Sequence, residues 1–156
     1  MIRLSRLSDY AIVLMAHLAG MRGPGPHAAR EVAASAGLPL PVASKLMKAL
    51  ARQGLLVSHR GSKGGYSLAR SPARITAAEM IAALDGPIGL TECAVHPGAC
   101  LQESSCHVRE PWQRINAVVR DALAGVTLAD LAQPPHGGGP DVLPIAGSGL
   151  AAGGAR

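Results

Sequence analysis

Aromatic side chains are scarce in this sequence, whose 156 residues include no Phe, one Trp and two Tyr. The hydrophobic share is still 48%, so a core has to be built from Leu, Ile, Val, Met and Ala, residues that favour helices. The length corresponds to one compact domain, with or without appendages. A large multidomain enzyme is therefore excluded.

Acidic side chains are nearly missing from the first half of the chain. Residues 1–74 hold eleven Lys and Arg but two acids, a net charge of +9, whereas residues 75–156 hold four bases and eight acids, a net charge of −4. Because the basic half attracts polyanions, nucleic acid is the leading partner.

Long hydrophobic runs are also absent. The apolar stretch from Ala11 to Leu18 is too short to span a bilayer, and His17 interrupts it. We therefore interpret it neither as a membrane anchor nor as a secretory signal. Three cysteines cannot form a complete intramolecular disulfide framework, which favours a reducing compartment. These features predict a cytoplasmic protein with no membrane partner.

The first half predicts three helices. The first has Ser5 or Ser8 as its N-cap, ends at Gly20, and carries a stripe of apolar residues at helical spacing. The members of this stripe are Leu4, Leu7, Ala11, Leu14 and Leu18. An Ala-rich helix over 28–36 follows, and prolines 39 and 41 open a third helix.

This third helix has an apolar face and a basic outer face. The apolar face is formed by Val42, Leu46, Ala49 and Leu50. Two helices joined by a Gly-containing turn, the second with a basic outer face, form the helix-turn-helix pattern, whose second helix lies in the major groove. In that arrangement Ser44 faces base edges, whereas Lys45 and Lys48 attract phosphates.

A β-hairpin, or wing, is predicted directly after this motif, with strands over 55–60 and 66–68 and a Gly-rich turn over 61–65. Arg60 and Lys63 lie at its tip on flexible backbone, which suits approach to a phosphate or entry into a minor groove. The alternative is a merely soluble hairpin, and the position right after a basic helix-turn-helix argues against it.

Three further helical segments are predicted in the second half. A capping box over 76–79 begins a helix that ends at Gly86. Pro111 opens another helix, which ends at Gly125, and Thr127 caps a last short turn. The helix opened by Pro111 repeats apolar residues along one face, namely Trp112, Ile115, Val119 and Ala122.

No further large element is available to cover this face, because residues 133–156 contain seven Gly and four Pro and are expected to be disordered. A homodimer packed along the helix would bury the face. It would also place two DNA-binding domains against a two-fold symmetric DNA site. The alternative is that the face packs onto the first three helices.

Cysteine is confined to one loop, where Cys93, Cys100 and Cys106 have the spacing C-x6-C-x5-C. Structural zinc sites prefer tighter pairs. An iron–sulfur cluster is larger than a single ion and suits three thiolates on a flexible loop, with one position left for a non-cysteine ligand. Zinc or another metal, and redox-reactive or inert thiols, are the alternatives.

An enzyme with a cysteine nucleophile and His96 or His107 as base is disfavoured. Adjacent residues such as Cys106 and His107 rarely face one another, and no phosphate-binding loop, paired-carboxylate motif or metalloprotease signature is present.

Several motifs resemble the Rrf2 family of regulators over residues 1–132. They are RLSRLSDYA at 3–11, RGSKGGYSLAR at 60–70 and the three-cysteine loop. LTEC at 90–93, SSC at 104–106 and WQRIN at 112–116 are similar to the branch that regulates the SUF iron–sulfur assembly system. The resemblance implies a winged-helix homodimer that binds an iron–sulfur cluster through the three cysteines and represses or activates promoters according to cluster state. It also implies that Arg60 reaches the minor groove.

The fourth cluster ligand departs from one branch of that family, which places a His three positions after the last cysteine. Arg109 stands there in this chain, and His107 directly follows Cys106. The nitric-oxide-sensing branch uses an Asp at the start of the first helix, in the place of Asp9. The resemblance therefore favours Asp9 over His107 and His96, whereas the bland interpretation of Asp9 is an acid that stabilises the helix dipole. Members with two-iron and with four-iron clusters exist, so both cluster types stay open.

Together these observations predict a mainly α protein with a small β-hairpin, a winged helix-turn-helix with a long C-terminal dimerisation helix. The expected organisation is a DNA-binding domain over 1–74, a cluster-binding loop with dimerisation helices over 75–132, and a disordered Gly/Pro-rich tail over 133–156. The expected function is cluster-controlled binding of double-stranded promoter DNA by a homodimer that regulates iron–sulfur assembly genes, with no catalysis and no small-molecule substrate. The alternatives are a nitric-oxide-sensing or redox-sensing repressor of the same family and a cluster-free thiol-redox regulator of the same fold.

Overall fold

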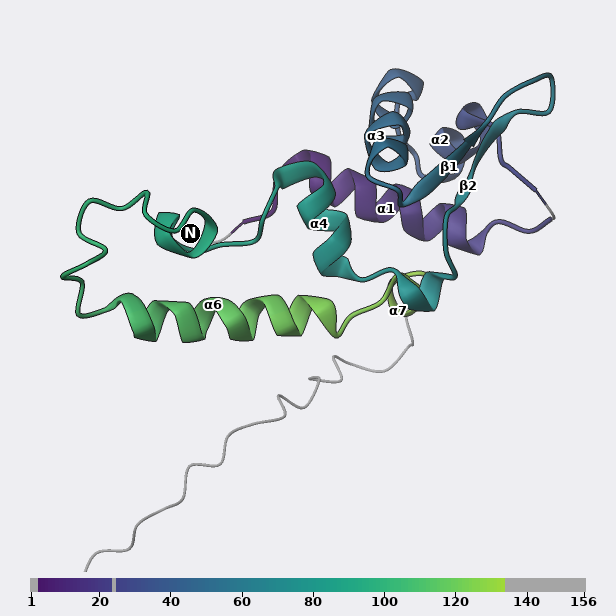
Figure 1. The fold of residues 1–156 in the computed structure, drawn as a ribbon. Coiled ribbons are helices and arrows are strands. Elements are labelled where there is room, and N and C mark those ends of the chain that lie inside the picture. Colours follow the sequence, from purple (N-terminus) through teal and green to yellow (C-terminus); the bar gives the residue numbers. More distant parts are fainter. Residues whose placement is uncertain (1–2, 24, 134–156) are drawn as a thin grey trace, which may run out of the picture.

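The first three helices follow the predicted order in the computed structural model, which describes residues 3–23 and 25–133 (Figure 1). They are α1 (Arg6–Gly20), α2 (Ala29–Ser35) and α3 (Leu40–Arg52). Ser5 is the N-cap of α1, since its side chain accepts a hydrogen bond from the backbone N–H of Ser8. The turn between α2 and α3 contains Gly37 at φ +65°, a conformation that favours glycine.

The apolar stripe of α1 begins later than predicted. Ala11, Leu14 and Leu18 are buried as expected, but Leu4 and Leu7 are each 44% exposed. The prediction for these two leucines was wrong because Leu4 precedes the helix, and because the inward-facing residue of the first turn is Ser8. Residue 7 is offset from that face by about 100° around the helix axis.

A two-stranded antiparallel sheet forms the predicted wing. Its strands are β1 (Leu56–His59) and β2 (Gly65–Leu68), with Leu56 opposite Leu68 and His59 opposite Gly65. The other edge of β2 is also paired, because His27 and Tyr66 exchange two backbone hydrogen bonds of 2.9 and 2.8 Å. The hairpin is therefore fixed to the loop before α2 as well as to α3.

The capping box predicted over 76–79 is confirmed. A short 3-10 turn, η1 (Pro72–Arg74), leads into α4 (Ala77–Asp85). The Thr76 hydroxyl accepts from the Glu79 N–H at 3.2 Å, and the Glu79 carboxylate accepts from the Thr76 N–H at 2.9 Å.

The chain leaves the core after α4 and later returns to it. It forms α5 (Glu92–Val95) and α6 (Arg109–Ala124), which begins two residues before Pro111, and then the Thr127-capped α7 (Leu128–Leu131). On its return, the Val126 carbonyl accepts from Ala77 and the Leu128 N–H donates to Ile75. We call residues 86–125 the arm and the remaining described residues the head. Figure 1 shows α6 lying along one side of the molecule, with α4 between it and α1.

The core belongs to the head. One cluster of buried side chains draws on α1 to α4, the start of the wing and Leu128 of α7. Within the described ranges every buried hydrophobic side chain is Ala, Val, Leu, Ile or Met, as the scarcity of aromatics predicts. The one buried residue of α6 is Asn116. No helix in the described part of the chain is long and apolar enough to cross a membrane, and the tail predicted to be disordered lies, from residue 134 on, outside it.

Candidate DNA interface and cysteine loop

The third helix turns one face to the core and the other to solvent. Ala43, Leu46, Met47 and Leu50 are buried, whereas the predicted apolar positions Val42 and Ala49 are only half-buried. Lys45 and Lys48 are exposed on the outer side, and Ser44 is half-buried between the two faces. The cations are thus placed as a recognition helix requires.

Two glycines define the tip of the wing because no side chain fits at either position. A Cβ on Gly65 would lie 2.2 Å from the carbonyl oxygen of His27, and one on Gly64 would lie 2.5 Å from the carbonyl oxygen of His59. Glycine permits this close backbone approach. Arg60 and Lys63 are exposed beside it. His59 Nε2 lies 2.8 Å from Ser67 Oγ across the strands, a contact that sequence reasoning missed and that strand register reveals.

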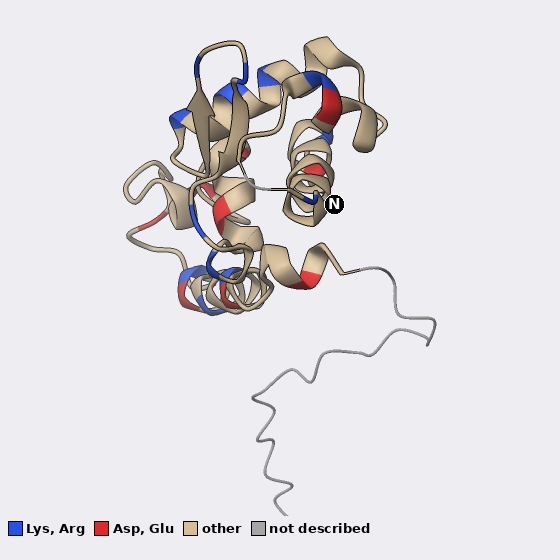
Figure 2. Ribbon diagram, turned by 90° about the vertical axis from the view of Figure 1, so that its right-hand side faces the viewer, with Lys and Arg blue, Asp and Glu red and all other residues tan. Residues whose placement is uncertain are grey.

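Positive charge gathers on the head. Figure 2 shows Lys and Arg along the helices and hairpin in the upper part of the molecule, while α6, seen nearly end-on below, mixes both signs. The predicted DNA contacts, Ser44, Lys45, Lys48, Arg60 and Lys63, come from two adjoining elements, since α3 packs against β1. Such a surface attracts the phosphate backbone of DNA.

The cysteine loop joins α4 to α6. Cys93 lies on the short helix α5, which packs against α6, and its Sγ is 3.3 Å from Thr91 Oγ1. The preceding backbone is fixed by Asn116, whose buried side-chain oxygen accepts from the Leu90 N–H at 3.0 Å. Asn116 belongs to the WQRIN motif, but this role was not predicted for it. A polar residue at an inward position of an amphipathic helix is the signal that would have indicated it.

Cys100 and Cys106 lie on the rest of the loop, on either side of Glu103. One Glu103 oxygen accepts from the Gly98 N–H at 2.6 Å, and the other is 2.7 Å from an Arg109 guanidinium nitrogen. Glu103 was not singled out from the sequence, because nothing in the local pattern shows that its partners lie five residues before and six after it.

The three thiols are free and half-buried, but they are not assembled. Among the described residues, no three His, Cys, Asp or Glu side chains lie close enough together to hold a metal ion. The candidate fourth ligands are dispersed as well, since His96 and His107 are exposed on the loop and Asp9 is exposed on α1.

A serine–aspartate clamp joins the start of α1 to the end of α4. Ser5 Oγ and Ser8 Oγ donate to the two oxygens of Asp85 at 2.7 and 2.8 Å. Partial burial raises the pKa of Asp85, but the hydrogen bonds from Ser5 and Ser8 lower it by more, so the pKa lies below its usual value. Asp9 lines a hollow beside this clamp. The clamp connects α1 to Asp85, the residue that precedes the cysteine loop.

The predicted apolar face of α6 is exposed in the chain described here. Trp112 and Ile115 are 41% and 46% exposed and Ala122 is exposed, whereas Val119 is half-buried. Val118, which was not among the predicted positions, is 60% exposed. The helix packs against α4 and α5 through its other side. Packing of this face onto the first three helices, the alternative weighed from the sequence, is not what the structure shows.

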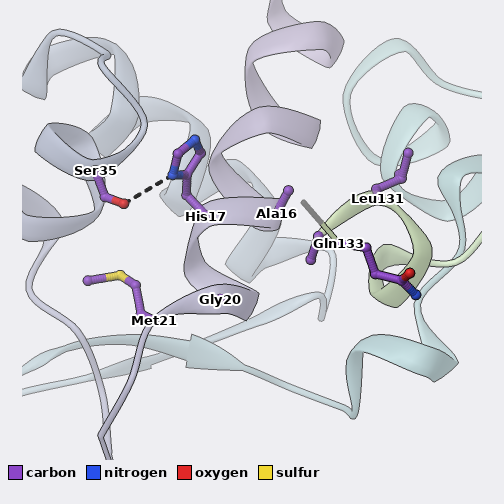
Figure 3. Close-up of a pocket in the computed structure, with 8 residues that line it drawn as sticks. Ala16, His17, Gly20, Met21, Ser35, Leu131 and Gln133 are labelled. Atoms are coloured by element: carbon purple, nitrogen blue, oxygen red, sulfur yellow. Dashed lines mark hydrogen bonds between the residues drawn. The ribbon is translucent and has the colours of Figure 1, made fainter. Parts of the chain in front are cut away.

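A hollow of 440 Å³ between α1, α2 and α7 is separate from both regions (Figure 3). His17 Nδ1 lies 3.1 Å from Ser35 Oγ at its edge. Its described lining contains no Lys, Arg, Asp, Glu or Cys; it consists of Ala16, His17, Gly20, Met21, Ser35, Leu131, Ala132 and Gln133.

The recognition helix, the basic wing after it and the exposed cations define a class of protein, the winged helix-turn-helix DNA-binding regulators. The particular family is the Rrf2 family, to which the chain belongs: its model, described as an iron-dependent transcriptional regulator, matches residues 4–134. The sequence is 33% identical to the regulator CymR of Bacillus subtilis over 135 residues, 86% of this chain and 93% of that protein. It is 30% identical to the regulator IscR of Xenorhabdus nematophila over 129 residues, 83% of this chain and 78% of that protein.

Solved structures agree with this assignment. The structure of CymR, titled the global cysteine regulator of B. subtilis, matches with a TM-score of 0.69 at 34% identity. The match covers 85% of this chain and 97% of that one. The structure titled T. potens IscR matches with a TM-score of 0.63 at 27% identity. The match covers 87% of this chain and 94% of that one. The predicted fold class is confirmed, and the protein is an Rrf2-type DNA-binding transcriptional regulator whose named relatives are regulators rather than enzymes.

Proposed function

We propose that this regulator binds promoter DNA as a homodimer, and that an iron–sulfur cluster held by Cys93, Cys100 and Cys106 controls its DNA affinity. Genes of iron–sulfur cluster assembly are the proposed targets, and Asp9 is the proposed fourth ligand. The observation that carries the proposal is the position of the three free thiols, all on the loop that joins the DNA-binding head to α6. The description of the family as iron-dependent supports it.

The donor set suits the group in number and chemistry. Three reduced thiols are soft ligands of the kind that iron–sulfur clusters take. Because the described thiols are not assembled, binding requires the loop to rearrange. A bound cluster would supply a redox-active centre. Oxidants and nitric oxide react with such a centre, and iron shortage limits its formation.

The residues around the loop connect it to the rest of the molecule. Asp85, at its start, is bonded to Ser5 and Ser8 of α1, and Asn116 of α6 holds Leu90. A change in the loop therefore acts on the DNA-binding head and on α6 together. The result is a population shift, limited by the difference in affinity of the cluster for the two loop arrangements.

The proposed homodimer buries the exposed face of α6. Apolar residues at positions 112, 115 and 118 cover this helix with nothing from the described chain on top of them, as interaction surfaces do. Sedimentation velocity should show a dimer for the wild type and a monomer for Ile115→Asp. Val57→Asp, an equally exposed apolar position on the wing, should stay dimeric.

A second candidate is a cluster-free thiol-redox regulator of the same fold. The unassembled thiols favour it, as does the similarity to a protein titled a cysteine regulator. It predicts DNA binding that responds to dithiothreitol and is indifferent to iron.

Anaerobic purification decides between the candidates. We expect brown wild-type protein with stoichiometric iron and sulfide per chain. The triple variant with Cys93, Cys100 and Cys106 changed to Ala should be colourless, and its affinity for a DNA fragment selected by binding to the wild type should differ from that of the wild type. Ser104→Ala, in the same loop, is the control and should behave like the wild type. A wild type that stays colourless after reconstitution points to the second candidate, and a triple variant with unchanged iron and DNA binding refutes the cluster proposal.

A further inference from the structure

The position three residues after the last cysteine is occupied by Arg109, whose chemistry excludes metal ligation. A guanidinium stays protonated in proteins and offers donors only. The structure shows instead what this side chain contacts: its Nη2 lies 2.7 Å from Glu103 Oε1.

Glu103 connects three parts of the cysteine loop. Its Oε2 accepts from the N–H of Gly98, at a φ of +86°, while its Oε1 meets Arg109. Its own N–H donates to the Cys100 carbonyl at 3.1 Å, and the Arg109 N–H donates to the Cys106 carbonyl at 3.4 Å. The ion pair therefore joins the turn that carries Cys100 to the turn that carries Cys106.

The surroundings of the Glu103–Arg109 ion pair strengthen its electrostatic attraction but leave the pair able to open. The Glu103 side chain is only 12% exposed, so solvent screens the attraction less than at a free surface. Arg109 makes one contact to the carboxylate rather than a two-pronged one, and its Nε is shielded with no partner among the described residues. A single-contact pair with an unsatisfied donor is weaker than a two-pronged one.

We propose that Glu103 and Arg109 form a latch that closes the loop segment bearing Cys100 and Cys106 while no metal is bound. This inference rests on the proposed function, since it concerns the same cysteines. Glu103 and Arg109 are positioning residues: they hold the two thiols half-buried and apart from other ligands, and opening of the latch frees them to bind. Cys93 is outside the latch, because Asn116 and α6 hold its part of the loop.

The test measures thiol reactivity in chelator-treated, metal-free protein of full length. Each cysteine is followed separately by alkylation with iodoacetamide and peptide mass spectrometry, in native buffer. We expect Glu103→Gln and Arg109→Ala to raise the rates at Cys100 and Cys106 about threefold to fivefold, the factor that corresponds to one partly exposed ion pair. The rate at Cys93 should stay at its wild-type value.

Matched variants separate the latch from general loosening of the loop. Glu110→Gln removes an exposed carboxylate next to Arg109 and should leave all three rates unchanged. Arg109→Lys keeps the positive charge and should restore most of the protection. Circular dichroism checks that each variant is folded, and Arg109→Lys keeps the test valid if Arg109→Ala unfolds.

The outcomes are distinct from those of the cluster experiment. Wild-type rates at Cys100 and Cys106 in Glu103→Gln would overturn the latch, as would an equal rise at Cys93. A colourless wild type with the expected rate pattern would refute the cluster and leave the latch standing. If the cluster forms, Glu103→Gln and Arg109→Ala should bind iron faster than the wild type during reconstitution, and a slower uptake counts against the latch.

Discussion

The head and the arm are held together by different kinds of contact. The head is built on one continuous aliphatic cluster from five helices and the wing. The arm has one buried residue in its long helix, Asn116, and contacts the core through the half-buried Leu123. Its loop is fixed by a few polar contacts centred on Asn116 and Glu103. Cooperative burial gives a structure that opens only on global unfolding, whereas isolated polar contacts open locally. The proposed DNA surface thus belongs to the part that cooperative burial holds, whereas the cysteines lie in a segment that local contacts hold.

The two regions meet at α4. There α6 packs against α4, and its half-buried Leu123 contacts the core of the head. Directly before the arm, Ser5 and Ser8 hold Asp85 at the end of α4. Movement of the arm therefore reaches the head through α1 and α4, which also pack against each other.

The largest expected contrast comes from the same substitution made in each region. Leu14→Ala empties a fully buried position of the core and should lower the free energy of unfolding by about 2–5 kcal/mol. Leu101→Ala removes a fully exposed side chain of the cysteine loop and should change it by less than about 0.5 kcal/mol. Urea unfolding followed by circular dichroism measures both, and similar losses would break the comparison.

A glycine pair tests whether the wing depends on close backbone approach. Gly65→Ala places a Cβ against the His27 carbonyl, so the two hydrogen bonds between His27 and Tyr66 are lost, at about 2 kcal/mol together. Gly20→Ala meets no atom within 4 Å and should be neutral or stabilise the protein by about 0.5 kcal/mol. Amide exchange at Tyr66 should accelerate only in the first variant, along with weaker DNA binding.

Paired charge removals test which region contacts DNA. Lys45→Ala with Lys48→Ala should reduce the slope of log affinity against log salt by about 2, because two phosphate contacts are lost. Arg114→Ala with Arg120→Ala removes the same charge from α6 and should leave the slope unchanged. Fluorescence anisotropy over a salt series measures both, and equal slopes in the two double variants would contradict the assignment.

The clamp at the junction should have the smallest effect. Asp85→Asn removes a carboxylate that accepts from both serines, at a cost of about 1 kcal/mol for a group near the surface. Because the folded-state pKa of Asp85 is lowered, its contribution is present above the unfolded-state pKa and is lost as pH falls through the folded-state value.

The pH dependence distinguishes the clamp from other carboxylates. The stability difference between the wild type and Asp85→Asn should be largest near neutral pH and should vanish in acid. Asp121→Asn, on the exposed surface of α6, is the control and should show no such convergence. A difference independent of pH would mean that Asp85 does not act through its charge.

Local signals in the sequence placed most of the elements correctly. Prolines 39 and 41, Gly37, the capping box at Thr76 and the cap at Thr127 mark helix ends by backbone chemistry, which needs no tertiary information. The hairpin was recognisable for the same reason, since its strands and turn lie within fourteen residues. Leu4 and Leu7 were misplaced because periodicity alone does not show where a stripe begins.

The candidate site was only half accessible from the sequence. Lys45, Lys48, Arg60 and Lys63 lie on elements whose outer faces follow from local patterns, so their exposure was predictable. The contacts of Asp85 with Ser5 and Ser8 span about eighty residues of chain, and no local pattern brings such partners together.

The sequence by itself determined an aliphatic, mainly helical chain with a basic reading head and three thiols confined to one loop, because composition, charge and capping act over short distances along the chain. Tertiary structure alone decided which side chains hold that loop and leave the face of α6 exposed. The latch of Glu103 and Arg109, the anchor at Asn116 and the clamp at Asp85 arise where packing of distant segments places a donor beside an acceptor, and such meetings are a property of the folded chain.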